Sequence, residues 1–343
     1  MRLFNTPIVG LFIIGFILFI MSLYSLTVGA ISISTIDVIY SLLGQQEDFQ
    51  TSLVVNEIRL PRLILGIIVG AGLAVAGAAM QGLFRNPLAD PGLVGVSSGA
   101  ALAAVTVIVL GGGFLSQYVV FWGYFALPLA AFAGGGLVTW LIYKIATKNG
   151  RTDVGLMLLT GIAIGAIAGA VTGLLTYFAT DAELRSLTFW SMGSIASASW
   201  QDIAISAGPI FLTVTILPFF ARALNAFLMG EAVSSHMGFN VKQLKFIVIT
   251  LTALAVGASV AVSGMIGFVG LVAPHIVRLL LGPDHRWLIP GSAILGAILI
   301  IGSDMVARTI LSPAELPIGI IMSAFGGPFF LWLLIQRRSR VGF

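Results

Sequence analysis

Long apolar stretches alternate with short polar connections along the whole chain. A helix needs about 20 consecutive apolar residues to cross a hydrocarbon core of roughly 30 Å. The sequence contains about ten such stretches, at residues 8–29, 63–83, 93–111, 119–142, 153–178, 201–222, 244–263, 266–281, 288–306 and 317–335. We therefore predict an all-α polytopic membrane protein with about ten transmembrane helices in a single membrane domain, residues 1–343.

Composition supports this prediction and excludes some kinds of site. Hydrophobic residues make up 58% of the chain and charged residues 9%, whereas about a quarter of the residues in a soluble domain are charged. The first stretch is too long for a secretory signal, lacks a small-residue cleavage site and is followed by more spans, so we expect it to be retained. Cysteine is absent, which excludes disulfides and thiolate metal sites.

Basic residues predict the orientation. Ten spans place both termini on one side, and that side collects all of the 17 lysines and arginines except Arg59, Arg62, Arg185 and Arg308. Positive charge is enriched in cytoplasmic loops. We therefore predict that the N- and C-termini are cytoplasmic. This bias also explains the high isoelectric point, so we expect no nucleic acid partner.

Two glycine-rich segments resemble each other. Residues 69–83 (VGAGLAVAGAAMQGL) and 256–271 (VGASVAVSGMIGFVGL) share a Val-Gly-Ala start and a later Gly and Met. The predicted spans run in opposite directions at these two places, as in an inverted repeat. Glycines at helical spacing, here and at 161–173, favour close packing of helices in lipid.

Enzymatic and ion-coupled functions receive little support. The three histidines, His236, His275 and His285, are far apart and lack metal-ligand spacing. No pair of carboxylates falls at mid-span, where ion-coupled carriers usually need ionisable groups. The chain also lacks a G-x-x-x-x-G-K-[ST] phosphate loop, so ATP-driven transport would require a second chain. From composition alone, a secondary transporter remains an alternative.

Two polar motifs interrupt the apolar pattern. Arg59 and Arg62 lie in IRLPRL at the outer end of the second span, and Arg308 lies at the outer end of the ninth. They are suited to pairing with carboxylates of a partner, or they snorkel to the interface, with Asp304 as a private partner of Arg308. The loop in residues 84–102 contains two prolines that break the helix, which suits either a cytoplasmic gate or an ordinary turn.

Several motifs resemble those of one family. RLPR, RNPLADPGLVGVSSGA, GFVGLVAPHIVR with the following DHR, and AELPIG match, in order, motifs of the ABC-importer permeases of the FecCD type, which take up vitamin B12, ferric siderophores and haem. The resemblance covers residues 5–337. It implies a type II importer permease in a bacterial cytoplasmic (inner) membrane.

The resemblance also implies partners and site residues. The permease pairs with a second copy, with two cytoplasmic ATPases that use the ATP, and with an external substrate-binding protein; it is not itself an enzyme and holds no permanent cofactor. Arg59, Arg62 and Arg308 match the docking residues for the binding protein. The coupling segment, about residues 224–238, contacts the ATPase through Leu224, Gly230, Glu231, Ala232, His236 and Gly238. Asn86, Pro87 and Leu88 match the cytoplasmic gate.

The cargo is the least determined property. The forms GLFRNPLADPGLVGVSSGAAL and FLMGEAVSSHMGF look closest to the haem-importing branch of the family. We therefore expect haem, with a ferric siderophore as the main alternative and vitamin B12 as a weaker one. No haem-ligating residue is assigned.

Overall fold

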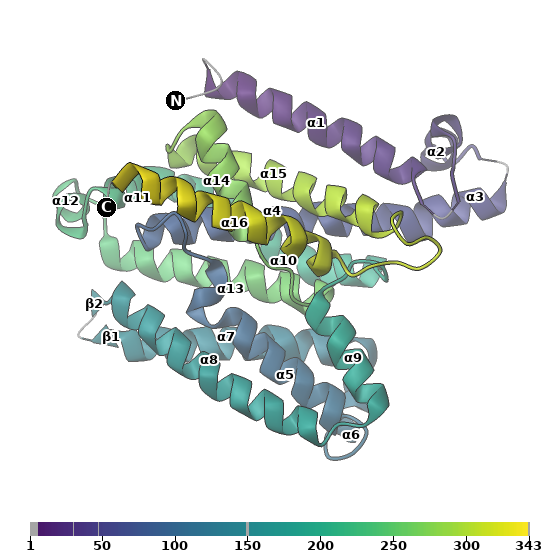
Figure 1. Ribbon diagram of the computed structural model, residues 1–343, viewed down its shortest axis with the longest axis horizontal. Coiled ribbons are helices and arrows are strands. Elements are labelled where there is room, and N and C mark those ends of the chain that lie inside the picture. Colours follow the sequence, from purple (N-terminus) through teal and green to yellow (C-terminus); the bar gives the residue numbers. More distant parts are fainter. Residues whose placement is uncertain (1–5, 30, 47, 149–150, 342–343) are drawn as a thin grey trace.

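The computed structural model describes residues 6–29, 31–46, 48–148 and 151–341. Long helices run along the molecule, with short elements at its two ends (Figure 1). A small antiparallel hairpin joins β1 (Thr147–Lys148) to β2 (Arg151–Thr152). The prediction of an all-α membrane protein is confirmed.

Eight helical segments of the described chain are long and apolar enough to cross a membrane. They are α1 (Pro7–Thr27), Phe49–Leu83 ending in α4 (Leu60–Leu83), Ser116–Ala146 ending in α7 (Ala126–Ala146), α8 (Val154–Tyr177), Trp200–Leu228 beginning with α10 (Trp200–Ile216), α13 (Val241–Ser263), α15 (His285–Ala307) and α16 (Ile318–Val341). Two shorter apolar helices are α5 (Val96–Leu110) and α14 (Val269–Leu281). Together these segments follow the ten predicted stretches in order.

Shorter elements gather at the two ends of the bundle (Figure 1). One end carries α2 (Thr35–Leu42), α3 (Phe49–Leu53), α6 (Ser116–Trp122) and α9 (Asp181–Met192). The other end carries α11 (Ala221–Leu228), α12 (Glu231–His236) and the hairpin. Single turns complete the chain, a π-helical one at Val54–Arg59 and 3-10 turns at Pro91–Val94, Gly123–Phe125 and Leu217–Phe220. We call the first the arginine end, after Arg59, Arg62 and Arg308, and the second the hairpin end.

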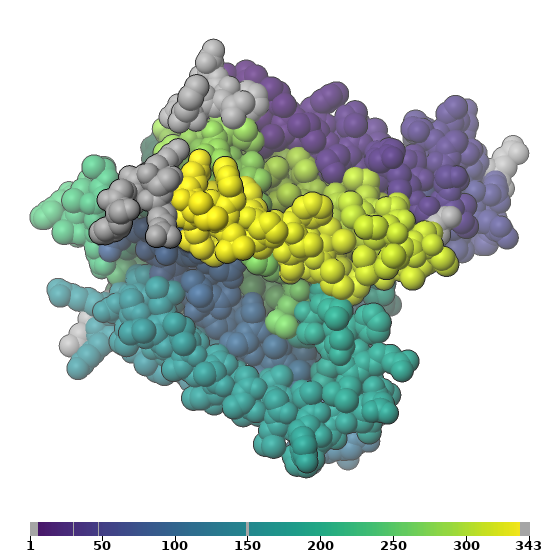
Figure 2. Space-filling model, in the orientation of Figure 1, coloured from purple at the N-terminus to yellow at the C-terminus, as the bar shows by residue number. Residues whose placement is uncertain are grey.

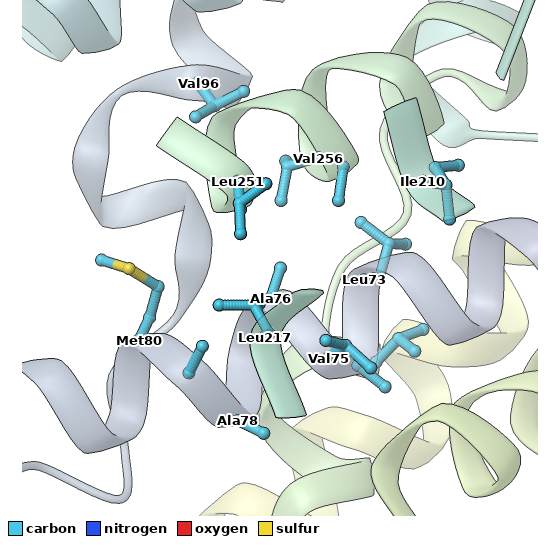
Figure 3. Packing of buried hydrophobic residues seen from close by; sticks show 14 of the residues in the cluster. Leu73, Val75, Ala76, Ala78, Met80, Val96, Ile210, Leu217, Leu251 and Val256 are labelled. Atoms are coloured by element: carbon cyan, nitrogen blue, oxygen red, sulfur yellow. The ribbon is translucent and has the colours of Figure 1, made fainter. Parts of the chain in front are cut away.

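Helix α4 is the centre of the bundle. In its most apolar stretch, 78% of the residues are buried. Leu73, Val75, Ala76, Ala78 and Met80 of α4 lie among side chains from α5, α10, α13 and the Leu217–Phe220 turn (Figure 3). Small residues permit this, since helices in lipid associate by close backbone packing.

Glycine is required where α4 crosses its neighbours. A Cβ atom at Gly77 would collide with the carbonyl oxygen of Gly270 in α14, and one at Gly70 with that of Gly296 in α15. The packing role predicted for these glycines is therefore observed. In α8 this role is observed at Gly161, where a Cβ atom would collide with the carbonyl oxygen of Leu93, but not at Gly169 or Gly173, where a Cβ atom would meet nothing within 4 Å in one copy of the chain.

The two resembling segments run in opposite directions. Arg85, just after α4, and Lys245, near the start of α13, lie 5.5 and 5.8 Å from the centre of the same Phe227 ring. Helix α4 thus ends where α13 begins, at the hairpin end. The opposite orientation predicted for residues 69–83 and 256–271 is observed.

Candidate functional site

Arg62 joins three segments at the arginine end. Arg62 lies in the first turn of α4, next to Pro61, where the helix continues directly from the π-helical turn Val54–Arg59. Its guanidinium lies 2.8 Å from Oδ1 of Asp304 in α15 and 2.9 Å from Oε2 of Glu315 in the loop that follows. Fork-shaped pairing of this kind fixes geometry as well as charge.

Arg59 and Arg308 are held by the end of α1. Arg59 donates hydrogen bonds to the carbonyl oxygens of Leu26, at 2.6 Å, and of Ile31. Arg308 donates to the carbonyl oxygen and the hydroxyl of Ser25, at 2.9 and 2.8 Å. Both arginines are buried. All three predicted docking arginines therefore lie together, but they face partners inside the chain.

We call these three arginines with Asp304 and Glu315 the arginine cluster. Its three cations face two carboxylates, which leaves one positive charge in excess. The Glu315 side chain is 36% exposed, whereas those of Arg62 and Asp304 are 7% and 4% exposed. Glu315 is therefore the member of the cluster that a molecule from outside reaches most easily.

Asp304, the partner expected for Arg308, pairs mainly with Arg62. Asp304 lies 3.6 Å from the Nε atom of Arg308 but 2.8 Å from Arg62. The spacing of four residues on α15 suggested Arg308 as the partner of Asp304. In the structure, Arg62 of α4 instead binds both carboxylate oxygens of Asp304. Sequence reasoning also missed Glu315, although AELPIG is one of the motifs and contains it.

The predicted coupling segment, residues 224–238, forms α11 and α12 at the hairpin end. Gly230 separates the two helices with a φ of 123°, a conformation that favours glycine. Leu224 is buried in α11, while Glu231, Ala232 and His236 of α12 are exposed. Gly238, with a φ of 87°, ends the segment. Helix α12 projects from the body of the molecule (Figure 1).

Lys245 ties this segment to the hairpin. Its Nζ atom lies 2.8 and 2.9 Å from the two carboxylate oxygens of Glu231 and 2.7 Å from the carbonyl oxygen of Thr152. The ammonium is buried. Sequence reasoning counted Lys245 only as a cytoplasmic charge, but its place inside a predicted span was a signal, because such lysines need a partner.

Asn225 ties the same segment to the start of α15. Its amide donates to Asp284 Oδ1 at 2.7 Å, and its carbonyl oxygen accepts from the backbone N–H of His285 at 3.0 Å. Asp284 also pairs with Arg286 at 2.6 Å. Hydrogen bonds and charge from Arg286, assisted by Asn225, lower the pKa of Asp284 to about 2.

The predicted gate residues lie in an ordered loop next to the coupling segment. Asn86 is exposed and accepts a hydrogen bond from the N–H of Leu88 at 3.0 Å, while Pro87 and Leu88 are half-buried. Phe227 of α11 is buried beneath the loop and contacts the guanidinium of Arg85. Gate and coupling segments thus share a contact, and sequence reasoning did not identify Phe227.

Asp90 fixes the second half of this loop. Its carboxylate accepts from the N–H of Gly92 at 2.7 Å and caps the turn Pro91–Val94. Burial raises the pKa of Asp90. Gly95 then adopts a φ of 81° and starts α5. The proline-broken loop is therefore a defined structure.

Helices α8 and α16 leave an apolar face open. Only 17% of the residues in the most apolar stretch of α8, and 33% in that of α16, are buried. Between residues 154 and 177, and between 318 and 335, neither helix contains a charged residue. Figure 2 shows the surface hollowed between the yellow α16 and the teal α8 and α9.

The histidines do not form a ligand set. His236 is exposed on α12, His275 packs against the Phe329 ring at 5.9 Å, and His285 is buried beside Asn225. Among the described residues, no group of three or more His, Cys, Asp or Glu residues is suited to hold a metal ion. The open face of α8 and α16 could therefore contact a ligand through apolar groups and not through a metal site.

Comparison with known proteins gives one consistent result. The sequence pattern of the FecCD transport family matches residues 17–336 of this chain. The hemin transport system permease protein HmuU of Yersinia pestis is 43% identical over 292 residues, covering 82% of this chain and 83% of that protein. The cobalamin import system permease protein BtuC of Halobacterium salinarum is 42% identical over 287 residues, covering 84% and 74%.

A citrate permease and a solved structure are also similar. The Fe(3+)-citrate import system permease protein YfmE of Bacillus subtilis is 37% identical over 329 residues, covering 96% of this chain and 95% of that protein. A solved inward-facing structure of a transporter assigned to the metal-chelate type of ABC transporters superposes with a TM-score of 0.83 at 32% identity. It covers 95% of this chain and 98% of the other.

Proposed function

The chain belongs to the FecCD transport family and is the permease of an ABC importer, and we propose that the cargo it carries is haem. The observation that carries this proposal is the open face of α8 and α16, which is apolar and uncharged across both helices. A porphyrin presents a flat apolar macrocycle, with its charge confined to the propionates. Citrate and most siderophores present polar groups all round, and such a face would leave these groups without partners.

Sequence identity alone does not choose among the cargoes. The hemin and cobalamin permeases are 43% and 42% identical to this chain, and the citrate permease is 37% identical. The match of the segments in residues 82–102 and 227–239 to the haem-importing branch is the second support for haem.

A second copy of the chain would enclose the pathway. The exposed side chains of α8 and α16 are large and apolar, including Leu159, Ile162 and Phe325 at 66%, 66% and 68% exposure. Two such faces opposed across an axis would enclose a path for the cargo and exclude lipid from it.

The hairpin end would face the cytoplasm, in a bacterial inner membrane. Its exposed Lys144, Lys148, Arg151 and Lys242 follow the positive-inside rule. The ATPase would bind the coupling segment there. Met229 and Met237 of the coupling segment are 71% and 58% exposed. Binding of the ATPase would cover these two apolar side chains and remove them from water.

The arginine end would receive a substrate-binding protein. Carboxylates of that protein would approach the arginine cluster beside Glu315, its exposed member, because the excess positive charge of the cluster attracts them in spite of Glu315. Cargo would then enter between the two copies. ATP binding in the partner would shift α12, and with it the gate residues Asn86, Pro87 and Leu88, between two packings of different nucleotide affinity.

Reconstitution tests the function. The permease with its ATPase, placed in liposomes with the loaded binding protein, should take up haem in an ATP-dependent manner, and should not take up ferric citrate or cobalamin. Uptake of ferric citrate alone would leave the importer in place and overturn the cargo. Haem uptake by the permease without ATPase, driven by an ion gradient, would instead support a secondary transporter.

A further inference from the structure

An apolar groove runs between α7 and α13, and its lining includes no residue of the arginine cluster or of the coupling segment. Its volume is about 320 Å³. Aromatic side chains form much of its wall, with Phe132, Trp140 and Tyr143 from α7 and Phe246 from α13. Trp140 and Phe246 are each about half exposed, at 53% and 52%. The groove therefore opens on the surface of the bundle.

The length of the groove matches one leaflet of a bilayer. Its lining on α7 extends from Phe132 to Tyr143, a distance of eleven helical steps, or about 16 Å at a rise of 1.5 Å per residue. Half of a hydrocarbon core of roughly 30 Å is about 15 Å. One acyl chain lying along the groove would reach from the hairpin-end interface to the middle of the membrane.

Two lysines flank the mouth of the groove at the hairpin end. Lys144 follows Tyr143 and holds its ammonium 5.5 Å from the centre of the Trp140 ring. Lys242 lies one turn before Phe246 on α13 and is exposed. Among the described residues, neither lysine forms an ion pair, and the carboxylate of the nearby Glu231 is taken by Lys245. Lys242 also lines a separate pocket with Glu231 and Lys245. The hairpin end of the groove thus carries two positive charges without an ion-pair partner among the described residues.

We propose that this groove binds an anionic phospholipid, with one acyl chain along the aromatic wall and the phosphate between Lys144 and Lys242. The apolar wall, the length of one leaflet and the two lysines at one mouth together fit an anionic phospholipid. None of these three features is needed to transport the cargo. The proposal is independent of the cargo, because the groove does not include the open face of α8 and α16.

Gly136 provides a clean way to block the groove. It lines the groove, and a Cβ atom there would meet nothing within 4 Å, so the side chain of Gly136→Leu starts in open space and extends into the space for the lipid. Gly15 of α1 is also a helical glycine at which a Cβ atom would meet nothing within 4 Å, and it is not part of the groove. Gly15→Leu is therefore the matched control.

The test is native mass spectrometry of the purified full-length chain in detergent, titrated with phosphatidylglycerol or phosphatidylcholine. The wild-type chain and Gly15→Leu should retain one phosphatidylglycerol more tightly than phosphatidylcholine, and Gly136→Leu should lose this preference. Changing both Lys144 and Lys242 to Gln should weaken retention roughly thirtyfold, since each basic residue near a membrane surface contributes about fivefold. Arg185→Gln, at the arginine end, should have no effect.

Either of two results would overturn the proposal. Equal retention of phosphatidylglycerol by the wild-type chain and by Gly136→Leu would show that the lipid binds elsewhere. Equal retention of the two lipids by the wild-type chain would show that the lysines do not select charge. Both results leave haem uptake untouched, so the two proposals fail separately.

Discussion

The Nζ atom of Lys245 lies 2.8 Å from the Oε2 atom of Glu231 and 2.7 Å from the carbonyl oxygen of Thr152. A lysine ammonium has three N–H donors, and here they bind α12 and the hairpin at once. The hairpin in turn connects α7 to α8, the helix with the open apolar face. Lys245 therefore links the proposed ATPase contact to the proposed pathway.

Replacing Lys245 should uncouple transport from ATP hydrolysis. In Lys245→Met, Glu231 and the Thr152 carbonyl lose their partner, which should lower stability by about 1–2 kcal/mol because Glu231 is half exposed. We expect haem uptake per ATP hydrolysed to fall roughly fivefold to thirtyfold, as a coupling free energy of 1–2 kcal/mol gives. The measurement is phosphate release and uptake in the same liposomes.

The control for this variant is another lysine on the same side. Lys148→Met removes an exposed charge from the hairpin without touching the link. It should hydrolyse and transport like the wild-type protein. If Lys245→Met keeps the wild-type ratio of uptake to hydrolysis, the link through Lys245 does not carry the motion.

Gly77→Ala should destabilise the bundle, because the added methyl group collides with the backbone of Gly270. Overpacking of this kind costs about 1–3 kcal/mol or more, since backbone moves less easily than a side chain. The melting temperature in detergent should fall by several degrees. Gly173→Ala on α8 is the matched change into open space, and it should melt like the wild-type protein; equal melting of both variants would contradict the packing role of Gly77.

Much of the fold was predictable because lipid imposes a simple rule. Apolar length located every long helix, and the glycine pattern located the crossings of α4 at Gly70 and Gly77. The short helices at the ends were less visible. Helix α9 falls between two predicted spans and was not predicted, although Thr180 and Glu183 form a capping box there and give a sequence signal for a helix start.

The site was harder to predict because its contacts join distant residues. Arg62 and Glu315 are 253 positions apart. A single sequence shows that both lie near the ends of spans, but it does not show that the loop containing Glu315 packs against α4. The contact between Lys245 and Thr152, which are 93 positions apart, could not be predicted for the same reason. The family resemblance named the arginines and the coupling segment, and only the structure reveals their partners in this chain.

Asp284 should make stability depend on pH in acid. Its folded pKa is about 2, below the usual value of 3.8, so the carboxylate stabilises the fold above pH 3.8 and loses this effect as the pH falls toward 2. Asp284→Asn should therefore melt a few degrees below the wild-type protein at pH 6, and the difference should shrink between pH 4 and pH 2. Thermal unfolding in detergent across this range is the measurement, and a difference that does not vary with pH would contradict it.

Glu315 offers the most informative test of docking at the arginine end. Replacing Arg62 itself would leave Asp304 buried without its main partner, a loss of about 3–5 kcal/mol that would confuse folding with docking. Glu315→Gln keeps the pair between Arg62 and Asp304 and raises the excess positive charge of the arginine cluster by one.

If the binding protein docks through carboxylates, Glu315→Gln should bind it about fivefold more tightly at low salt, because removing one nearby negative charge changes the interaction by about 1 kcal/mol. The gain should vanish at high salt, where exposed charges are screened. Surface plasmon resonance with the reconstituted importer measures both. Asp181→Asn on α9 removes an exposed carboxylate at the same end, outside the cluster, and should leave the affinity unchanged. An equal gain in both variants would mean that net charge alone attracts the binding protein, and no gain in Glu315→Gln would place docking away from the arginine cluster.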